Sequence, residues 1–305
     1  MNEDDTGPAD GFRAGTIALI GRPNAGKSTL LNRLVGVKLS IVSDKPQTTR
    51  HRIRGVVTSD NGQAVFVDTP GIHRPQYRMN RRMMDTTRQV LHEVELVALL
   101  VDAAESRGRG LEYTLKLVED LKVPVVLLLN KVDKLPKTDQ LPLIDWFQQR
   151  GSFAEIVPIS ALKGANCAGL LDIFLGYLPA GAPLFPVDEL TDRSERFLAA
   201  ELVREQLLHR TREELPYTTA VTVDQWTEPE RAGGSVVICA TIYVDRPTQK
   251  PIVIGKGGKM LRGVGQSARM QIAELLGRPV HLELWVKVKP SWREQAPILD
   301  MLEIQ

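Results

Sequence analysis

The first part of the chain repeats one pattern, in which a short apolar run is followed by a longer amphipathic stretch. The apolar runs have the length of strands and lie at 17–20, 64–67, 96–101, 125–129 and 156–159. The stretches with helical spacing lie at 29–34, 79–92, 111–121, 144–149 and 170–177. Since strands that alternate with helices form parallel sheets, the pattern predicts an α/β domain with a mostly parallel sheet and helices on both faces.

The pattern changes after residue 193. Ser194 is typical of a helix N-cap, and an apolar stripe follows it as far as residue 208. Strands are predicted at 217–223, 236–244, 252–254 and 280–288, and a further helix at 260–276. Apolar and polar residues alternate strictly along 280–288, as in a strand with one buried face. This order predicts a smaller α+β domain.

A proline-rich stretch separates the two patterns, and 305 residues are more than one domain usually holds. We expect a disordered acidic tail at 1–14, a first domain at 15–180, a linker at 181–192 and a second domain at 193–305. The formal net charge is only +2, so a nucleic-acid surface has to be a local patch.

Cysteine content and hydropathy bear on the compartment. Cys167 and Cys239 are far apart in the sequence, so we expect no disulfide and a reducing environment. The N-terminus lacks an apolar signal region, and the apolar run at 94–101 is too short to cross a bilayer. We therefore expect a soluble cytoplasmic protein.

The stretch GRPNAGKS at 21–28 has the spacing of a phosphate-binding loop, between a predicted strand and a predicted helix. Its backbone N–H groups can surround an anion, and the helix N-terminus adds partial positive charge. Lys27 can reach the β- and γ-phosphates, and the Ser28 hydroxyl can bind Mg²⁺. The alternative is a glycine-rich turn with a chance Lys-Ser pair. The candidate nucleotide-binding residues here are Gly21, Arg22, Pro23, Asn24, Ala25, Gly26, Lys27, Ser28 and Thr29.

Three further motifs follow predicted strands: DTPG at 68–71, NKVD at 130–133 and SALKG at 160–164. Ligands of parallel sheets bind at the carboxyl ends of the strands, so these motifs should meet at one site. In the first of them, Asp68 can bind Mg²⁺ through water, and the N–H of Gly71 can approach the γ-phosphate. The candidate nucleotide-binding residues of this motif are Asp68, Thr69, Pro70 and Gly71.

The NKVD motif predicts a preference for guanine. Asp133 offers two carboxylate oxygens, which match the N1–H and 2-amino donors of guanine and would stay unpaired against adenine. Asn130 can hold the O6 side, and the stem of Lys131 can cover the base. Ser160, Ala161 and Leu162 close the base pocket. The alternative for NKVD alone is a polar helix-capping turn.

Together these motifs resemble those of the translation-factor-type GTPases. The resemblance implies GTP and GDP as ligands and a threonine of the first switch loop, DKPQTTR at 44–50, as a ligand of Mg²⁺ and the γ-phosphate. Thr48 and Thr49 both qualify, and we choose Thr49. The Mg²⁺ ligands would be Ser28, Thr49 and Asp68, and the catalytic residues Lys27, Asn24, Thr49 and Gly71.

Ile72 follows DTPG, where Ras-like GTPases place a glutamine that orients water. Isoleucine cannot orient water by hydrogen bonding, so the chain resembles GTPases with a slow intrinsic rate. In some of these an asparagine at the position of Asn24 helps to hold K⁺ near the β- and γ-phosphates. The alternative is that Asn24 bonds within its own loop.

In the second domain, Gly255, Lys256, Gly257 and Gly258 form a G-x-x-G loop before a helix, and Lys259 follows. In KH domains such a loop clamps the backbone of single-stranded nucleotides. The element order resembles a type II KH domain, which makes these five residues the candidate RNA-binding residues. The alternative is a tight turn.

Nearly the whole chain resembles the family of Era-type GTPases, a branch of the TrmE-Era-EngA-like superfamily. This resemblance rests on sequence segments such as YVDRPTQKPIVIGKGGKML and LELWVKVKPSWR. It implies recognition of the 3′ end of 16S ribosomal RNA, a role in assembly of the 30S subunit, a monomer, and peripheral association with the inner membrane. Three alternatives are a transfer-RNA modification GTPase, which would need a catalytic cysteine, a membrane-fission or trafficking GTPase, and a non-catalytic RNA scaffold. We also expect tighter RNA binding with a GTP analogue than with GDP.

Overall fold

The computed structural model describes residues 11–72, 77–105, 108–231 and 233–304. The chain divides into two compact units. The first holds the described residues within 1–39, 52–74 and 84–192, and the second holds those within 40–51, 75–83 and 193–305.

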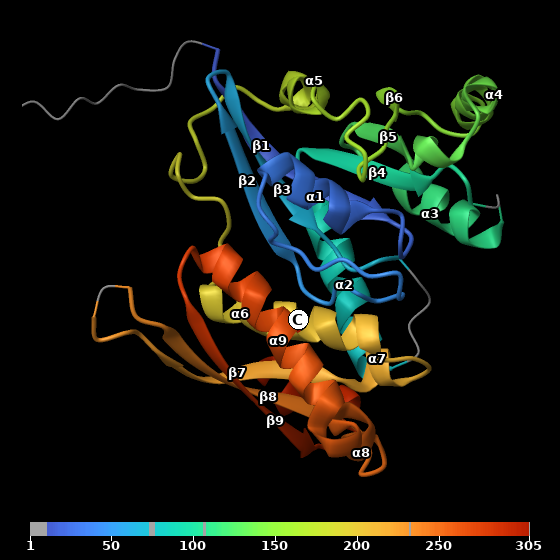
Figure 1. Ribbon diagram of the computed structural model, residues 1–305. Coiled ribbons are helices and arrows are strands. Elements are labelled where there is room, and N and C mark those ends of the chain that lie inside the picture. Colours follow the sequence, from blue (N-terminus) through green and yellow to red (C-terminus); the bar gives the residue numbers. More distant parts are fainter. Residues whose placement is uncertain (1–10, 73–76, 106–107, 232, 305) are drawn as a thin grey trace, which may run out of the picture. The chain divides into compact units, whose positions relative to one another are not determined.

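The first unit contains a six-stranded sheet in the order β2-β3-β1-β4-β5-β6 (Figure 1). Its strands are β1 (Arg13–Gly21), β2 (Ile53–Ser59), β3 (Gly62–Asp68), β4 (Leu96–Asp102), β5 (Val125–Asn130) and β6 (Glu155–Pro158). Only β2 is antiparallel to its neighbour, so the predicted mostly parallel sheet is confirmed. The central strands are buried along almost their whole length, as the continuous apolar runs indicate.

Helices cover both faces of this sheet. They are α1 (Lys27–Val35), α2 (Arg78–Glu93), α3 (Arg109–Glu119), the short 3-10 turn η1 (Val132–Lys134), α4 (Lys137–Gln148) and α5 (Leu170–Tyr177). Helices α2, α3 and α4 pack on the face that carries Ala18, Leu99 and Leu127. On the other face, Phe174 of α5 packs edge-on against Phe66 of β3. Helix α4 begins seven residues before the predicted start and contains Pro142.

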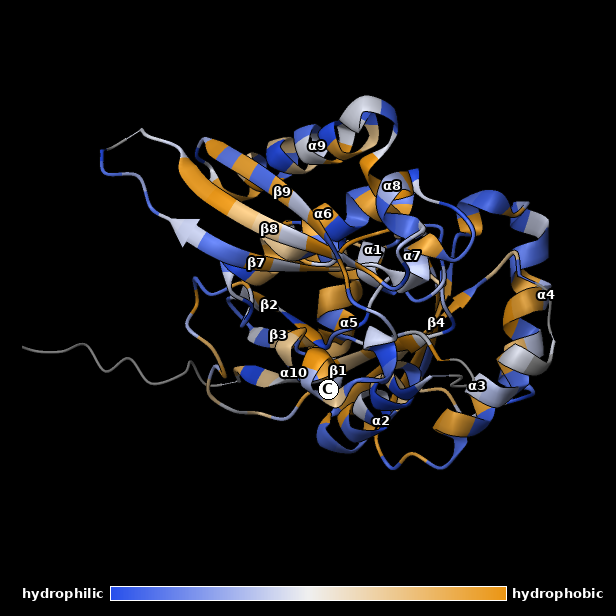
Figure 2. Ribbon diagram, turned by 90° about the horizontal axis from the view of Figure 1, so that it is seen from below, coloured by the Kyte–Doolittle hydropathy of each residue, from blue (hydrophilic) through white to orange (hydrophobic). Residues whose placement is uncertain are grey.

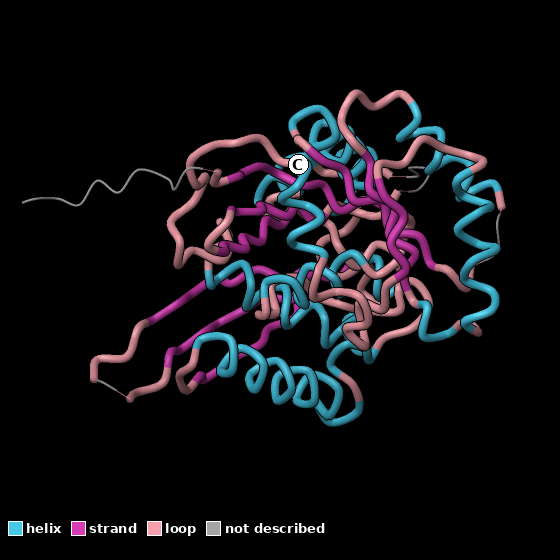
Figure 3. The backbone as a smooth tube through the Cα atoms, turned by 90° about the horizontal axis from the view of Figure 1, so that it is seen from above, coloured by secondary structure: helices cyan, strands magenta, loops and turns pink. Residues whose placement is uncertain are grey.

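The second unit is an α+β domain, as predicted, built on the three-stranded sheet β7-β8-β9. Its elements are α6 (Glu195–Arg210), α7 (Leu215–Thr218), β7 (Ala220–Thr227), β8 (Val236–Val244), α8 (Gln249–Ile254), η2 (Lys256–Gly258), α9 (Lys259–Leu276), β9 (Val280–Val288), η3 (Trp292–Glu294) and α10 (Ala296–Met301). Strand β8 pairs antiparallel with β7 and parallel with β9. The long helices α6 and α9 lie along one face of the sheet (Figures 1 and 3).

Alternation along β9 decides which of its residues enter the core, and it appears in Figure 2 as bands of contrasting hydropathy. Val280 and Val286 are buried, whereas Trp285 is 59% exposed. Trp292, by contrast, is fully buried, and its indole N–H donates to the carbonyl of Thr218 at 2.9 Å. Trp292 is therefore a packing residue.

The prediction of a strand at 252–254 is wrong, since these residues end helix α8. The side-chain oxygen of Gln249 accepts hydrogen bonds from the N–H groups of Asp245 and Arg246, at 2.9 and 3.0 Å, and so stabilises the start of this helix. Val253 is buried in the core of the unit. Tertiary packing thus overrides the strand propensity of Ile-Val-Ile.

Several boundaries also differ from expectation. Residues 215–218, partly predicted as strand, form α7. Arg13 and Ala14, placed in the predicted tail, begin β1 and pair with β3, while residues 1–10 lie outside the described part of the chain. Segment 40–51 and the start of α2 belong to the second unit, although both were placed in the first domain.

The predicted linker packs into the first unit. Its Asp192 forms an ion pair with Arg54 at 2.9 Å, and the Gln63 side chain bonds the backbone of Leu184 and Phe185. Within the described part of the chain, no helix combines the length and the apolar character that a membrane span requires.

Candidate functional site: a nucleotide-binding edge and a nucleic-acid groove

The four motifs of the first unit lie at the carboxyl ends of its strands. Gly21 ends β1, Asp68 ends β3 and Asn130 ends β5, and Ser160 follows β6. Parallel pairing in register brings Leu19 opposite Asp68 at this edge. The structure therefore gathers the motifs at one edge of the sheet, as predicted.

The loop 21–28 leads directly into helix α1. Gly26 is the N-cap and has φ +103°, and a Cβ there would collide with the side chain of Asn130, so glycine is required. Lys27 is only 5% exposed, and its Nζ donates to the carbonyls of Gly21 and Arg22, each at 3.2 Å. The ammonium group is thus held over the curve of the loop.

Burial lowers the pKa of Lys27 to about 8, and the nearby carboxylate of Asp68 opposes this shift. The lysine is therefore still mostly protonated at pH 7, yet it is poorly solvated. A phosphate placed against it would supply the missing negative partner and raise the pKa again.

Ser28 and Asp68 lie together beside the loop. The Ser28 hydroxyl donates to Asp68 Oδ2 at 2.7 Å, and Asp68 is fully buried. A hydroxyl and a carboxylate are hard oxygen donors that suit Mg²⁺. The third predicted ligand, Thr49, belongs to the second unit, and its part in the Mg²⁺ site stays a prediction.

Asn130 ties two of the loops together. Its Nδ2 donates to the carbonyl of Ala25 at 2.7 Å, and its Oδ1 accepts from the N–H of Ala161 at 2.9 Å. This buried amide therefore links the phosphate loop to the base pocket, and its predicted contact with guanine O6 stays a prediction. Asp133 remains exposed, and Leu162 is 66% exposed.

Two residues of this site lie outside the motifs. Asp102, at the end of β4, pairs with Lys131 at 2.7 Å and so holds the stem that would cover a base. Arg33 of α1 donates to the carbonyls of Ala161 and Leu162 and braces the SALKG loop. Asp102 could have been found, because it ends a buried parallel strand as Asp68 does. Arg33 carries no such signal.

Ile72 does not face the site. It is 4% exposed and lies in the apolar core with Ala18 and Val67, while its N–H donates to the carbonyl of Gly21 at 3.1 Å. This geometry agrees with the inference that Ile72 orients no water. At Gly71 a Cβ would come within 2.9 Å of Pro23, so glycine keeps the two loops in close contact.

Two residues of loop 21–28 are more exposed than Lys27. Asn24 is exposed and has φ +63°, a left-handed conformation that asparagine tolerates. Arg22 forms an ion pair with Glu105. These two side chains therefore lie on the solvent side of the loop.

The structure weighs against a catalytic role for Cys167. Cys167 is buried, and burial raises the pKa of its thiol while Arg33 opposes the shift. A thiol with a raised pKa is mostly protonated at neutral pH, and the protonated form is a poor nucleophile.

In the second unit the G-x-x-G loop makes a sharp turn between α8 and α9. Gly255, Gly257 and Gly258 have φ of +75°, +59° and +74°. Lys256 and Lys259 are both exposed. Three positive φ values in four residues explain why glycine fills the loop, and they leave the backbone accessible.

A groove of about 540 Å³ continues from this loop between α9 and β9. Its floor is apolar, with Leu261, Leu282 and Leu284, and Arg262 and Arg269 add positive charge. Gln266 and His281 line it as well and were missed, because nothing in the sequence pairs a position on α9 with one on β9.

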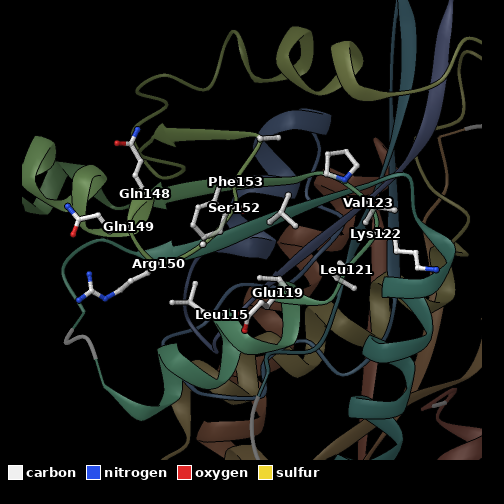
Figure 4. Close-up of a pocket in the computed structure, with 15 residues that line it drawn as sticks. Leu115, Glu119, Leu121, Lys122, Val123, Gln148, Gln149, Arg150, Ser152 and Phe153 are labelled. Carbon is white, nitrogen blue, oxygen red and sulfur yellow. The ribbon is translucent and has the colours of Figure 1, made fainter.

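A larger hollow of about 800 Å³ lies at the opposite edge of the first unit's sheet (Figure 4). It is lined by Val125, where β5 begins, whereas the motif residue Asn130 is where β5 ends. Lys122 and Arg150 point away from one another at its two ends (Figure 4). This hollow is therefore separate from the nucleotide-binding edge.

The fold and the sites define a P-loop GTPase domain joined to a KH domain. Comparison with protein-family models agrees: residues 16–131 match the 50S ribosome-binding GTPase family, and residues 214–293 match the KH domain. The predicted fold class is confirmed for both parts.

The relatives are more specific. The chain is 45% identical over 288 residues to GTPase Era from Heliobacterium modesticaldum, covering 94% of this chain and 96% of that protein. It is 43% identical to Era solved with MgGDPNP and nucleotides 1506–1542 of 16S ribosomal RNA, with a TM-score of 0.92, and the match covers 95% of this chain and 98% of that one. A single-residue variant of Aquifex aeolicus Era bound to GDP·AlF4⁻ matches with 43% identity, a TM-score of 0.91 and the same coverage. The chain belongs to the Era family, and it is a GTPase.

Proposed function

We propose that this protein binds the 3′ region of 16S ribosomal RNA through the groove between α9 and β9 and acts in ribosome biogenesis. The observation that carries the proposal is the combination of a guanine-nucleotide site in one unit with an exposed glycine clamp and groove in the other. The Era structure that contains nucleotides 1506–1542 supports it, because it covers 95% of this chain. Gly255, Lys256, Gly257, Gly258 and Lys259 would grip the RNA backbone.

For the nucleotide, the proposal assigns the phosphates to loop 21–28 with Lys27, and the base to Asn130, Lys131, Asp133 and the 160–162 segment. Ser28, Asp68 and Thr49 would hold Mg²⁺, which supplies positive charge between the β- and γ-phosphates. The related structures contain MgGDPNP and GDP·AlF4⁻, which supports Mg²⁺ and guanine nucleotides as ligands. Asn24 would support K⁺ beside the phosphates, where no glutamine is available for the chemistry.

The resemblance to the Era family also supports a cellular setting. The proposal places the protein in the cytoplasm as a monomer that acts on the 30S subunit, with peripheral contact with the inner membrane. The γ-phosphate and Mg²⁺ would order the segment around Thr49, which belongs to the KH unit by its contacts. The nucleotide can bias RNA binding only by its different affinity for two arrangements of the molecule.

The decisive experiment measures RNA affinity in each nucleotide state. A fluorescent RNA with the 3′-terminal sequence of 16S ribosomal RNA is titrated with the full chain in the presence of GDPNP and Mg²⁺, or of GDP and Mg²⁺. We expect about 5- to 100-fold tighter binding with GDPNP, the range of ordinary allosteric coupling. An RNA of the same composition in scrambled order is the control.

Equal affinities in the two nucleotide states would refute the coupling and leave RNA recognition standing. Equal affinities for the native and scrambled RNA would instead refute the proposed RNA target.

A further inference from the structure

A cluster of buried charged side chains lies in the second unit, apart from the RNA groove. Arg50, next to the switch threonines, and Arg204 of α6 are each 2% exposed. His51 and Glu201 accompany them and are 7% and 5% exposed. Nothing in the nucleotide or RNA chemistry described above requires charges to be buried here.

The protein satisfies most of the cluster's hydrogen-bonding groups. Arg204 donates from Nε and Nη2 to the two carboxylate oxygens of Glu201, at 2.7 and 2.6 Å, and from Nη2 to the carbonyl of Thr48. Arg50 donates to the carbonyls of Thr219 and Pro216, at 2.7 and 3.0 Å.

Two donors remain. Within the described part of the chain, Arg50 Nε and Arg204 Nη1 are buried and have no hydrogen-bond acceptor. A buried N–H group without an acceptor is costly, and more so on a cation. Both remaining groups therefore require an acceptor that the protein does not supply.

The charges of the cluster do not balance. Glu201 compensates one of the two guanidinium groups, and the Trp292 ring, 5.7 Å from Arg50, adds only a partial contribution. Burial lowers the pKa of His51 to about 4, so this imidazole is neutral at pH 7, and its Nδ1 lies 3.2 Å from the carbonyl of Glu303.

The neighbouring arginines have carboxylates of their own. Arg193 pairs with Glu303 at 2.9 Å, and Arg293 with Asp245 at 3.7 Å. One positive charge of the buried cluster therefore stays uncompensated, which an apolar interior disfavours.

A cavity of about 30 Å³ lies among these side chains. Arg50, Arg204, His51 and Glu201 line it, and its remaining wall is made by Phe197, Ala200, Ala220, Val221, Leu302 and Ile304. This space accommodates one small ion or one or two water molecules, because a single probe sphere needs roughly 10–15 Å³. It is too small for a phosphate or a carboxylate-bearing molecule.

We propose that this cavity is a binding site for a single halide ion, chloride under ordinary conditions, held between Arg50 and Arg204. A halide accepts several N–H donors at once and supplies the negative charge that the cluster lacks. Since Arg50 follows Thr49 directly, the bound ion would also stabilise the C-terminal end of segment 40–51 within its unit.

The first test is diffraction from crystals of the full chain soaked in sodium bromide. We expect an anomalous bromide peak between the two arginines. Density at this position without anomalous signal would be water and would overturn the proposal, as would the absence of any density.

The second test is thermal unfolding of the full chain at pH 7 and constant ionic strength, as sodium gluconate is replaced by sodium chloride. A specific site predicts a rise of a few degrees that saturates with chloride concentration. A strictly linear dependence, or no dependence, would contradict the site.

Two variants test whether the chloride response depends on this cavity or on arginines elsewhere in the chain. Arg50→Gln should lose the saturating chloride response, whereas Arg212→Gln, which changes an exposed arginine outside the cavity, should keep it. If Arg50→Gln does not fold, the bromide experiment on the unmodified chain still decides the matter. Persistence of the full response in a folded Arg50→Gln protein would refute the proposal.

Discussion

The chain contains two glycine loops suited to phosphate groups, and they differ in how far they are enclosed. In loop 21–28 the lysine is 5% exposed, and Asn130 braces the loop from another motif. In loop 255–258 and at Lys259 directly after it, both lysines are exposed, and the glycines give the loop its shape through their positive φ values. The same residue types are thus embedded in one unit and displayed on the other.

The difference reflects two tasks. A loop that stabilises charge during phosphoryl transfer needs donors that are fixed and shielded from water, since the interaction is then stronger and needs no reorganisation. A loop that grips the backbone of a long polymer needs open access. Its exposed charges are screened by salt, so this interaction should be salt-dependent.

The sharpest way to test the enclosed loop is Lys27→Ala. We expect GTP hydrolysis to fall by about 10²–10³-fold, because a desolvated cation aimed at the phosphates is lost. Phosphate release under single-turnover conditions measures this rate.

The matched control is Lys256→Ala, which removes the corresponding lysine of the exposed loop and should leave hydrolysis within about twofold of the unmodified rate in the absence of RNA. Turnover in the unmodified protein no faster than in Lys27→Ala would mean that the nucleotide is only structural, as the RNA-scaffold alternative holds.

The exposed loop is tested by Gly257→Asp. We expect RNA affinity to fall by roughly 10- to 100-fold, since a carboxylate would then face the phosphate backbone at a residue with φ +59°. Titration of the fluorescent 16S-derived RNA measures the change, and GTP affinity should stay unchanged.

Gly257→Asn is the matched control for this change. Asparagine has nearly the same shape and tolerates positive φ, but it is neutral, so its loss of RNA affinity should be smaller. Loss of both GTP and RNA binding in Gly257→Asp would show that the two sites are not separable.

The smallest expected change in hydrolysis concerns Asn24, an exposed residue of loop 21–28. If Asn24 supports K⁺, hydrolysis should be roughly severalfold faster in KCl than in NaCl, well below the roughly 10³–10⁵ of an arginine finger. The effect should be modest because Asn24 is exposed. Asn24→Ala should remove the difference, and equal rates for the unmodified protein would contradict the K⁺ hypothesis.

The local pattern of apolar and polar residues was sufficient to predict the sheet of the first unit and the position of its motifs. Buried parallel strands appear in sequence as continuous apolar runs, and their carboxyl ends meet at one edge whatever the details of packing. The order of elements therefore already places Asp68, Asn130 and Ser160 beside the phosphate loop. The turn at Gly257 and Gly258 could be predicted for a similar reason, because the backbone conformation that requires glycine is local.

Contacts between distant residues decided the rest. Residues 252–254 form a helix whose Val253 packs into the core of the second unit, and segment 40–51 joins that unit through partners such as Arg204. Neither Arg33 under the SALKG loop nor the halide cavity has a sequence signal, since each depends on groups far apart in the chain. The sequence by itself determined which chemistry each loop can perform, and the tertiary structure decided which loop is enclosed and which is displayed.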